Sequence, residues 1–235
     1  MKPVDETELC RIICTSEDGS AVRRAKLYLW YAMENWPEKK LRQYVSNEHS
    51  VIRELAEWHL WRRTLDTSME SLLEVIQEAD NEVKVYEAAT LLGRKKCTDA
   101  IGALIALLAN ESPVIRDGAA AGLRELGLQE ALHPLVAAIR RHPDNCDSFV
   151  FALQSLDCTS IAEFLVDLFI SQPLAFFVRL CIYECFAGRQ IGTLDAGTRF
   201  RCCRKIEMAI QESAVPEDIE QLQDLKGAIE MCCTK

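Results

Sequence analysis

The 235-residue sequence is poor in the residues that interrupt helices, with only 10 glycines and 7 prolines. Nearly half of its residues are apolar, so that a disordered chain is not expected. No apolar run approaches the roughly 20 residues that a membrane-spanning helix needs. The first residues include acids where a signal peptide carries a basic segment followed by an apolar one. We therefore expect a folded protein without a membrane span.

An excess of positive charge is also missing, because the formal net charge is −9. Proteins that bind nucleic acids usually present a basic face, so this charge argues against DNA or RNA as the main ligand. Catalytic patterns are absent as well. The four histidines stand at no metal-ligand spacing, and no glycine-rich phosphate loop follows a strand. The sequence predicts neither an enzyme nor a bound cofactor.

Cysteine, by contrast, is abundant. Eleven cysteines are an odd number in a chain that is large enough to fold without disulfide bonds. Free thiols are typical of a reducing compartment. This composition favours a cytoplasmic location.

One phrase occurs twice, as VIRELA from Val51 and as VIRDGA from Val114, 63 residues later. A related stretch begins halfway between them, at Val83, so the repeating unit has 31 or 32 residues. The alanine of the phrase has an alanine or larger apolar counterpart in six units, and each is followed four residues later by a large apolar residue. These counterparts are Ala25, Ala56, Ala88, Ala119, Phe149 and Ile182. Residues four apart share one face of a helix.

A second ladder of leucines interleaves with the first, and apolar partners again follow four residues later. Its members are Leu9, Leu41, Leu72, Leu104, Leu135 and Leu165. Each unit therefore holds two helices with one apolar stripe apiece, and stacking neighbouring pairs buries both stripes. We predict an all-α fold, an α-solenoid (superhelix) of about seven antiparallel helix pairs with a repeat of 30–32 residues.

Turn-forming residues fall between the predicted helices. They are expected to supply turns, helix N-caps and first-turn prolines, and comprise Asp18-Gly19-Ser20, Ser46-Asn47, Asp80-Asn81, Asn110 with Ser112-Pro113, and Pro143-Asp144. Gly93 and Gly127 are expected near left-handed C-caps at the ends of second helices. The sequence predicts a single repeat domain over 1–235. Within it, regular repeats extend from about 5 to 187, a glycine-containing loop covers 187–199, and a capping helix pair occupies 199–233.

A helix pair of about 30 residues, whose second helix opens with Val/Ile-Arg and continues with Ala and Leu-Gly, resembles a short, armadillo-like HEAT repeat. The resemblance is to phycobilisome-lyase-type HEAT-like proteins and is clearest from about Val51 to Ile139. It implies a solenoid whose second helices line a concave groove. Members of this family include scaffolds, bilin lyases and chaperones, and DNA-binding variants. The arginine that is typical of the family stands at Arg53, Arg116 and Arg179, but Val85 replaces it in the third repeat.

Aromatic residues divide along the chain, with all four tryptophans before residue 87 and all eight phenylalanines after residue 148. Trp58 and Trp61 occupy positions where later repeats carry small or polar residues, so we expect them to project into the groove. Charged residues accompany them on the second helices. The full set of candidate partner-binding residues is Trp58, Trp61, Glu54, Glu57, Arg62, Glu87, Asp117 and Arg124. The alternative is that the tryptophans fill the end repeats and the charges are solvated.

Three functions remain open. The first is a non-enzymatic scaffold, adaptor or inhibitor, of the bacterial immunity type, which binds a basic or amphipathic segment of another protein in its concave groove. The second is a bilin lyase or bilin-binding chaperone, in which Arg62 and Arg63 would hold the propionates beside the tryptophans. The third, a HEAT-like DNA-binding protein, would need a basic concave face.

Cysteines become frequent towards the C-terminus. Four thiolates, from Cys181, Cys185, Cys202 and Cys232, could surround one zinc ion. Their spacing lacks the CxxC pattern of structural zinc sites, and cysteine is an ordinary buried residue. The simpler interpretation is that these cysteines pack in the core.

Overall fold

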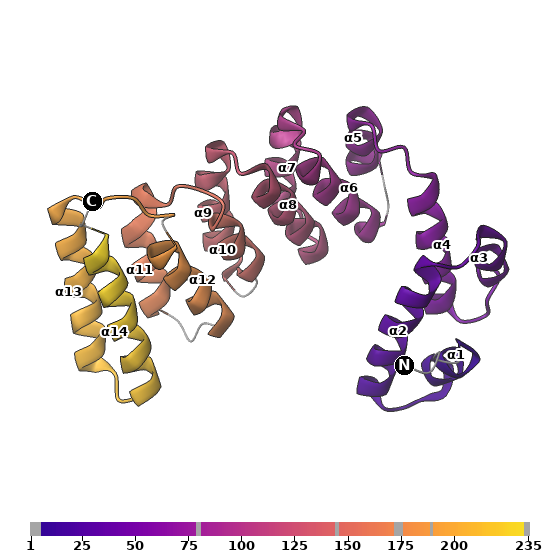
Figure 1. Cartoon of the computed structure of the whole chain (residues 1–235), viewed down its shortest axis with the longest axis horizontal. Coiled ribbons are helices and arrows are strands. Elements are labelled where there is room, and N and C mark those ends of the chain that lie inside the picture. The colour runs from indigo at the N-terminus through magenta and orange to yellow at the C-terminus, as the bar shows by residue number, and fades with distance from the viewer. Residues whose placement is uncertain (1–5, 79–80, 144–145, 172–175, 189, 233–235) are drawn as a thin grey trace. The chain divides into compact units, whose positions relative to one another are not determined.

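The computed structural model describes residues 6–78, 81–143, 146–171, 176–188 and 190–232. Within these ranges fourteen α-helices follow one another, joined by turns and short 3-10 segments, and no strand occurs (Figure 1). The helices form successive antiparallel pairs, so the prediction of an all-α repeat fold with about seven pairs is confirmed. None of the helices in the described ranges is long and apolar enough to cross a membrane.

The chain divides into two compact units, which are described separately. The N-terminal unit is Met1–Asp66 and the C-terminal unit is Thr67–Lys235. In the N-terminal unit α1 packs on α2, α3 packs on α4, and the second helices α2 and α4 pack on each other. The helices of this unit are α1 (Glu6–Thr15), α2 (Gly19–Glu34), α3 (Glu38–Tyr44) and α4 (Ser50–Thr64).

The C-terminal unit stacks its second helices in the order α6, α8, α10, α12 and α14, and among its first helices α11 packs on α13. Its first helices are α5 (Met69–Glu78), α7 (Ile101–Leu107), α9 (Leu132–Arg141), α11 (Ala162–Ser171) and α13 (Ala196–Glu212). Its second helices are α6 (Glu82–Arg94), α8 (Pro113–Leu126), α10 (Asp147–Leu153), α12 (Phe176–Ala187) and α14 (Pro216–Met231). Each second helix covers the apolar face of the next, which is the packing of a solenoid.

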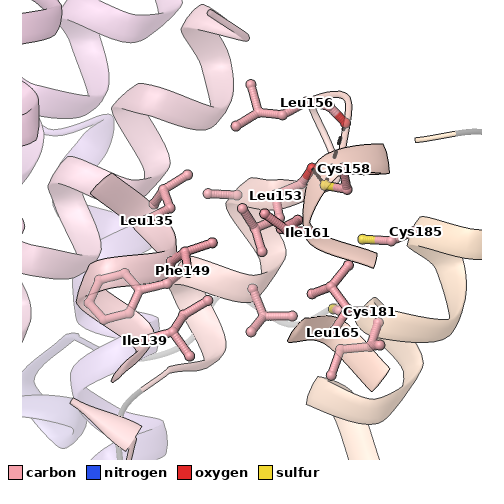
Figure 2. Packing of buried hydrophobic residues seen from close by; sticks show 14 of the residues in the cluster. Leu135, Ile139, Phe149, Leu153, Leu156, Cys158, Ile161, Leu165, Cys181 and Cys185 are labelled. Carbon is pink, nitrogen blue, oxygen red and sulfur yellow. Dashed lines mark hydrogen bonds between the residues drawn. The ribbon is translucent and has the colours of Figure 1, made fainter. Parts of the chain in front are cut away.

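Both predicted ladders are buried. Every residue of the ladder that begins at Ala25, and of the ladder that begins at Leu9, lies in the core. Among the partners four residues later, Val45, Leu60 and Ile76 are only partly covered. Figure 2 shows one part of this core, where Leu135 and Ile139 of α9 approach Phe149 and Leu153 of α10. The stripes that defined the repeat in the sequence are therefore the surfaces that hold neighbouring helices together.

Three of the predicted turn segments supply N-caps. The Asp18 carboxylate accepts a hydrogen bond from the backbone N–H of Ser20 at 2.8 Å. Asn81 Oδ1 accepts from the N–H of Val83 at 3.0 Å, and Ser112 accepts from Ile115 at 3.4 Å, with Pro113 at the first helical position. These side chains satisfy backbone donors that the first helical turn leaves free.

The two glycine predictions had different outcomes. Gly127 ends α8 in the left-handed region, with φ of 64°. The C-cap prediction for Gly93 was wrong, because Gly93 lies inside α6 and Lys96 adopts the positive φ after that helix. Gly93 serves close packing instead, since a Cβ there would overlap the backbone of Gly122 in α8. The sequence showed the glycine but not which neighbour required it.

The predicted loop over 187–199 is shorter in the structure, since α13 begins at Ala196. The connection is held by backbone hydrogen bonds: Ile191 N–H donates to the Cys185 carbonyl at 3.0 Å, and Cys158 N–H donates to the Gln190 carbonyl at 2.6 Å. Ile191 and Leu194 are buried. Arg189 and the end of the predicted capping pair at residue 233 lie outside the described residues.

Candidate functional site

The eight predicted partner-binding residues fall in both units. Five of them (Trp58, Trp61, Glu54, Glu57 and Arg62) lie on α4 of the N-terminal unit. The other three (Glu87, Asp117 and Arg124) lie on α6 and α8 of the C-terminal unit. Each group is therefore considered within its own unit.

Trp58 does not project into open space. It is only 8% exposed, and its ring centroid lies 4.0 Å from that of Trp30 on α2. The Arg62 guanidinium carbon lies 5.2 Å from the Trp58 ring. The expectation that Trp58 stands in a groove is therefore wrong, and the alternative of a tryptophan that fills the packing between two helices describes it better. Trp61 is partly buried, so that of the five predicted residues on α4 three are exposed, namely Glu54, Glu57 and Arg62.

Two polar atoms are buried in this packing. Trp58 Nε1 and His59 Nε2 have no hydrogen-bond partner within the described residues. The His59 ring lies 4.9 Å from both Trp30 and Trp58, measured between ring centroids. Burial lowers the pKa of His59, and the nearby Arg63 lowers it further. His59 is therefore disfavoured in its charged form, as expected for an imidazole in an aromatic environment.

Arg63, which the bilin hypothesis needs for a propionate, is engaged elsewhere. Its Nη1 donates to the Trp36 carbonyl at 2.6 Å, and its Nη2 donates to the carbonyl oxygens of Glu34 at 2.8 Å and Met33 at 3.2 Å. These carbonyls lie at the C-terminus of α2, where a cation is favoured by the helix dipole. Arg63 thus joins α4 to the end of α2.

A stripe on α2 was missed in the sequence. Leu27, Tyr28 and Tyr31 are 53%, 46% and 58% exposed, and Arg24 is exposed beside them. The four residues follow the spacing i, i+3, i+4, i+7, so they share one face of the helix. The buried residues Ala25 and Leu29 occupy a different face. The helical spacing of these four residues is present in the sequence, but they alternate along α2 with Ala25 and Leu29, which were assigned to the core from the sequence.

In the C-terminal unit the three predicted residues are spread over two helices and are not fully exposed. Glu87 and Asp117 are partly buried, and Asp117 Oδ1 is a buried atom without a hydrogen-bond partner. The Arg124 guanidinium carbon lies 4.0 Å from the ring centroid of Phe151 on α10, and its Nη1 lies 3.8 Å from the Glu125 carboxylate. Arg124 therefore belongs to a cation–π contact between successive second helices.

A hollow between α11, α12 and α14 was not predicted at all. It has a volume of about 230 Å³. Its lining consists of Phe169, Arg179, Leu180, Tyr183, Gln221 and Asp224. No motif marks these residues, because they come from three helices and only the stacking brings them together.

The four candidate zinc ligands do not form a metal site. No three histidine, cysteine or acidic side chains within the described ranges are grouped so that they could hold a metal ion. Cys158, Cys181 and Cys185 lie among apolar side chains of the core (Figure 2). Burial raises the pKa of Cys181 and of Cys202 to about 11, and a hydrogen bond with Cys158 together with burial raises that of Cys185. Zinc binds thiolates, so these protonated thiols are packing residues.

Cys232, the fourth candidate zinc ligand, is not part of the cysteine pair formed by Cys158 and Cys185. Its Sγ donates weakly to the carbonyl oxygens of Ala228 at 3.4 Å and Phe186 at 3.7 Å. The thiol links the end of α14 to α12, so its role is again structural.

The stacked pairs and their buried ladders define a helical-repeat protein. Residues 69–154 match the family model of HEAT repeats. The matched stretch extends from the start of α5 to the end of α10, and there the resemblance found in the sequence is confirmed. Repeats of this kind generally mediate protein interactions. The sequence matches no curated protein.

Proposed function

We propose that this chain is a non-enzymatic, cytoplasmic protein-binding repeat protein, a scaffold, adaptor or inhibitor that holds a partner protein on its second helices. One observation carries the proposal, namely the place of the exposed large apolar side chains. Most of those in the described residues lie on second helices rather than on first helices. They are Leu27, Tyr28 and Tyr31 on α2, Val83 on α6, Val114 on α8, Phe177 and Leu180 on α12, and Met231 on α14.

The chemistry of these residues fits a protein partner. Exposed apolar side chains mark an interaction surface when they gather, as Leu27, Tyr28 and Tyr31 do on one face of α2. Tyrosine, phenylalanine and arginine are enriched in the energetically important parts of interfaces. A stack of preformed helices also presents its surface without a large loss of conformational entropy on binding.

The alternatives receive less support. A bilin site at the tryptophans would use Arg62 and Arg63, and the guanidinium of Arg63 is occupied by the carbonyls at the end of α2. A DNA-binding face would need a basic stack. The N-terminal unit contains 11 of the 27 basic and 11 of the 36 acidic residues, so the whole net charge of −9 belongs to the C-terminal unit. Phosphates would be repelled by that unit.

The test is affinity capture from a lysate of the source cells, read by mass spectrometry. Two variants, Leu27→Ser/Tyr31→Ser and Phe177→Ser/Leu180→Ser, remove exposed apolar groups from second helices. The matched control is Phe200→Ser/Met208→Ser, which changes two residues of the first helix α13 that are 63% and 52% exposed. We expect a partner that the wild type and the control retain and at least one second-helix variant loses. Equal retention by all four well-folded proteins would refute the proposal.

A further inference from the structure

The hollow in the C-terminal unit has an apolar wall and an open side. Leu180 and Tyr183 of α12 face Gln221 and Asp224 of α14 across it, and the buried Phe169 of α11 completes the lining. Leu180 is 41% exposed. An apolar cavity of about 150 Å³ admits a benzene molecule. The volume of about 230 Å³ is therefore sufficient for one aromatic or large aliphatic side chain.

The apolar surface continues beyond the hollow. Phe177 precedes Leu180 by one helical turn and is 47% exposed. Its ring centroid lies 5.7 Å from that of Phe151 on α10. A segment that inserted a side chain at Leu180 would therefore find a second apolar contact along the stack.

The one cation of the lining is already neutralised. Arg179 Nη1 donates to the Asp218 carboxylate and to Gln221 Oε1, the latter at 3.0 Å. The guanidinium carbon lies 5.5 Å from the Phe169 ring centroid. Arg179 thus joins α12 to α14 and leaves no net positive charge at the hollow.

The side of α14 that carries Asp224, a lining residue of the hollow, is acidic. Glu217, Glu220 and Asp224 are exposed, and their spacing of three and four residues places them on one side of the helix. None of the three is joined to a basic residue by an ion pair within the described part of the chain, whereas Asp218 pairs with Arg179 and Glu230 with Lys226. Asp224 therefore lines the hollow as an unneutralised carboxylate, and Glu217 and Glu220 continue the acidic side of α14 beyond it.

We infer that the hollow between α12 and α14 binds a lysine- or arginine-containing amphipathic segment of a partner protein, which inserts one apolar side chain against Leu180 and Tyr183. The basic residues of the segment lie against the three carboxylates of α14. Charge complementarity of this kind selects the partner and speeds its encounter, while the buried anchor supplies most of the affinity. This inference rests on the proposed function and names the class of partner and the place where it binds.

The experiment is selection of a displayed library of random 16-residue peptides against the full chain, followed by affinity measurements with fluorescent copies of the enriched peptides. We expect the enriched peptides to combine an aromatic or aliphatic anchor with several lysines or arginines. Leu180→Ala is expected to weaken their binding by about tenfold or more. Asp224→Lys is expected to weaken binding by about fivefold at low salt and less at high salt.

Two controls match these variants. Phe200→Ala removes an exposed apolar side chain from α13, and Glu130→Lys reverses an exposed acid near α9. Neither is expected to change the affinity of the peptides by more than about twofold, since surface contacts outside an interface contribute little. Circular dichroism and melting of each variant establish that the fold is intact.

Several results would overturn the inference. Enriched peptides without basic residues, or peptides that bind Leu180→Ala as tightly as the wild type, would exclude a basic segment at this hollow. A wild-type dimer in sedimentation that Leu180→Ala dissociates would assign the hollow to a second copy of the chain. If the lysate partner is lost with Leu27→Ser/Tyr31→Ser but kept with Phe177→Ser/Leu180→Ser, the proposed function stands and this inference fails.

Discussion

The two units make the same contact between successive second helices with opposite kinds of residue. In the N-terminal unit Trp30 of α2 meets His59 of α4, with their ring centroids 4.9 Å apart. In the C-terminal unit Gly93 of α6 meets Gly122 of α8, backbone against backbone. Each glycine stands 63 residues after its aromatic counterpart, the same interval that separates the repeated phrase. These two repeat positions therefore hold rings in one unit and no side chain in the other.

The ladders beside these positions are alike in both units. Ala25 and Leu29 of α2 correspond to Ala88 and Leu92 of α6, and all four are buried. The ladder determines which face of each helix is covered, while the neighbouring residue determines how closely the helix backbones approach. A glycine pair allows backbone contact, and an aromatic pair fills the space with side chains. The same repeat pattern is thus compatible with two different spacings between helices.

The largest expected effect tests the aromatic side of this comparison. Trp58→Ala removes a buried ring from between α2 and α4, so the free energy of unfolding of the N-terminal unit should fall by about 3 kcal/mol. All four tryptophans lie in that unit, so denaturant unfolding followed by tryptophan fluorescence reports on it. Trp58→Phe keeps a ring and removes the unpartnered Nε1–H, and should cost about 1 kcal/mol. A loss for Trp58→Ala below about 1 kcal/mol would contradict the assignment.

The glycine side of the comparison is tested by Gly122→Ala. A Cβ at this position would overlap the backbone carbonyl of Ala89, which cannot move aside as a side chain could. The variant should destabilise the C-terminal unit by about 2 kcal/mol. Its matched control is Gly227→Ala in α14, where nothing lies within 4 Å of the added group.

The control should gain up to about 1 kcal/mol from helix propensity. Thermal unfolding followed by far-ultraviolet circular dichroism measures both variants. If Gly122→Ala stabilises the protein as Gly227→Ala does, the close approach of α6 and α8 is refuted.

A third comparison concerns the family arginine, which also recurs after 63 residues. Arg116 is 6% exposed and its Nη1 donates to the carbonyls of Asn110 at 2.8 Å and Glu111 at 2.7 Å. Arg53 is partly buried and its Nη1 donates to one carbonyl, that of Asn47, at 2.9 Å. Arg116→Ala should therefore cost about 2 kcal/mol and Arg53→Ala about 1 kcal/mol in chemical denaturation. Equal losses would show that burial and the second carbonyl add nothing.

The smallest expected effect is a dependence of the N-terminal unit on pH. Burial lowers the pKa of His59 in the folded state below the value of about 6.5 that an exposed histidine has. The unfolded chain therefore binds more protons near that pH. The resulting stability is present above the unfolded pKa and is lost as the pH falls below it.

We expect the denaturant concentration at the unfolding midpoint, followed by tryptophan fluorescence, to decrease when the pH is lowered from 7.5 to 5. The decrease should be smaller for His59→Gln, because glutamine stays neutral. The comparison between the two proteins removes the contribution of carboxylates that both share. The same pH dependence in His59→Gln and the wild type would exclude His59 as its source.

Much of the fold could be predicted from the sequence because its determinants are local. The spacing of Ala56 and Leu60, or of Ala119 and Leu123, is a property of one helix turn and its neighbour, and caps such as Asn81 act within three residues. The candidate site was predicted less well. Trp58 was expected in a groove and is buried, and the hollow beside Leu180 was not anticipated.

The sequence by itself determined that this protein is a stack of helix pairs, since a period near 31 residues with two apolar stripes has no other way to bury both. Only the tertiary structure decided which large side chains are covered by a neighbouring helix and which stand at the surface. That outcome depends on contacts between residues about 30 or more positions apart, such as Trp30 with Trp58 or Arg179 with Asp218. Such contacts follow from the spacing and rotation of whole helices, which no local pattern of residues specifies.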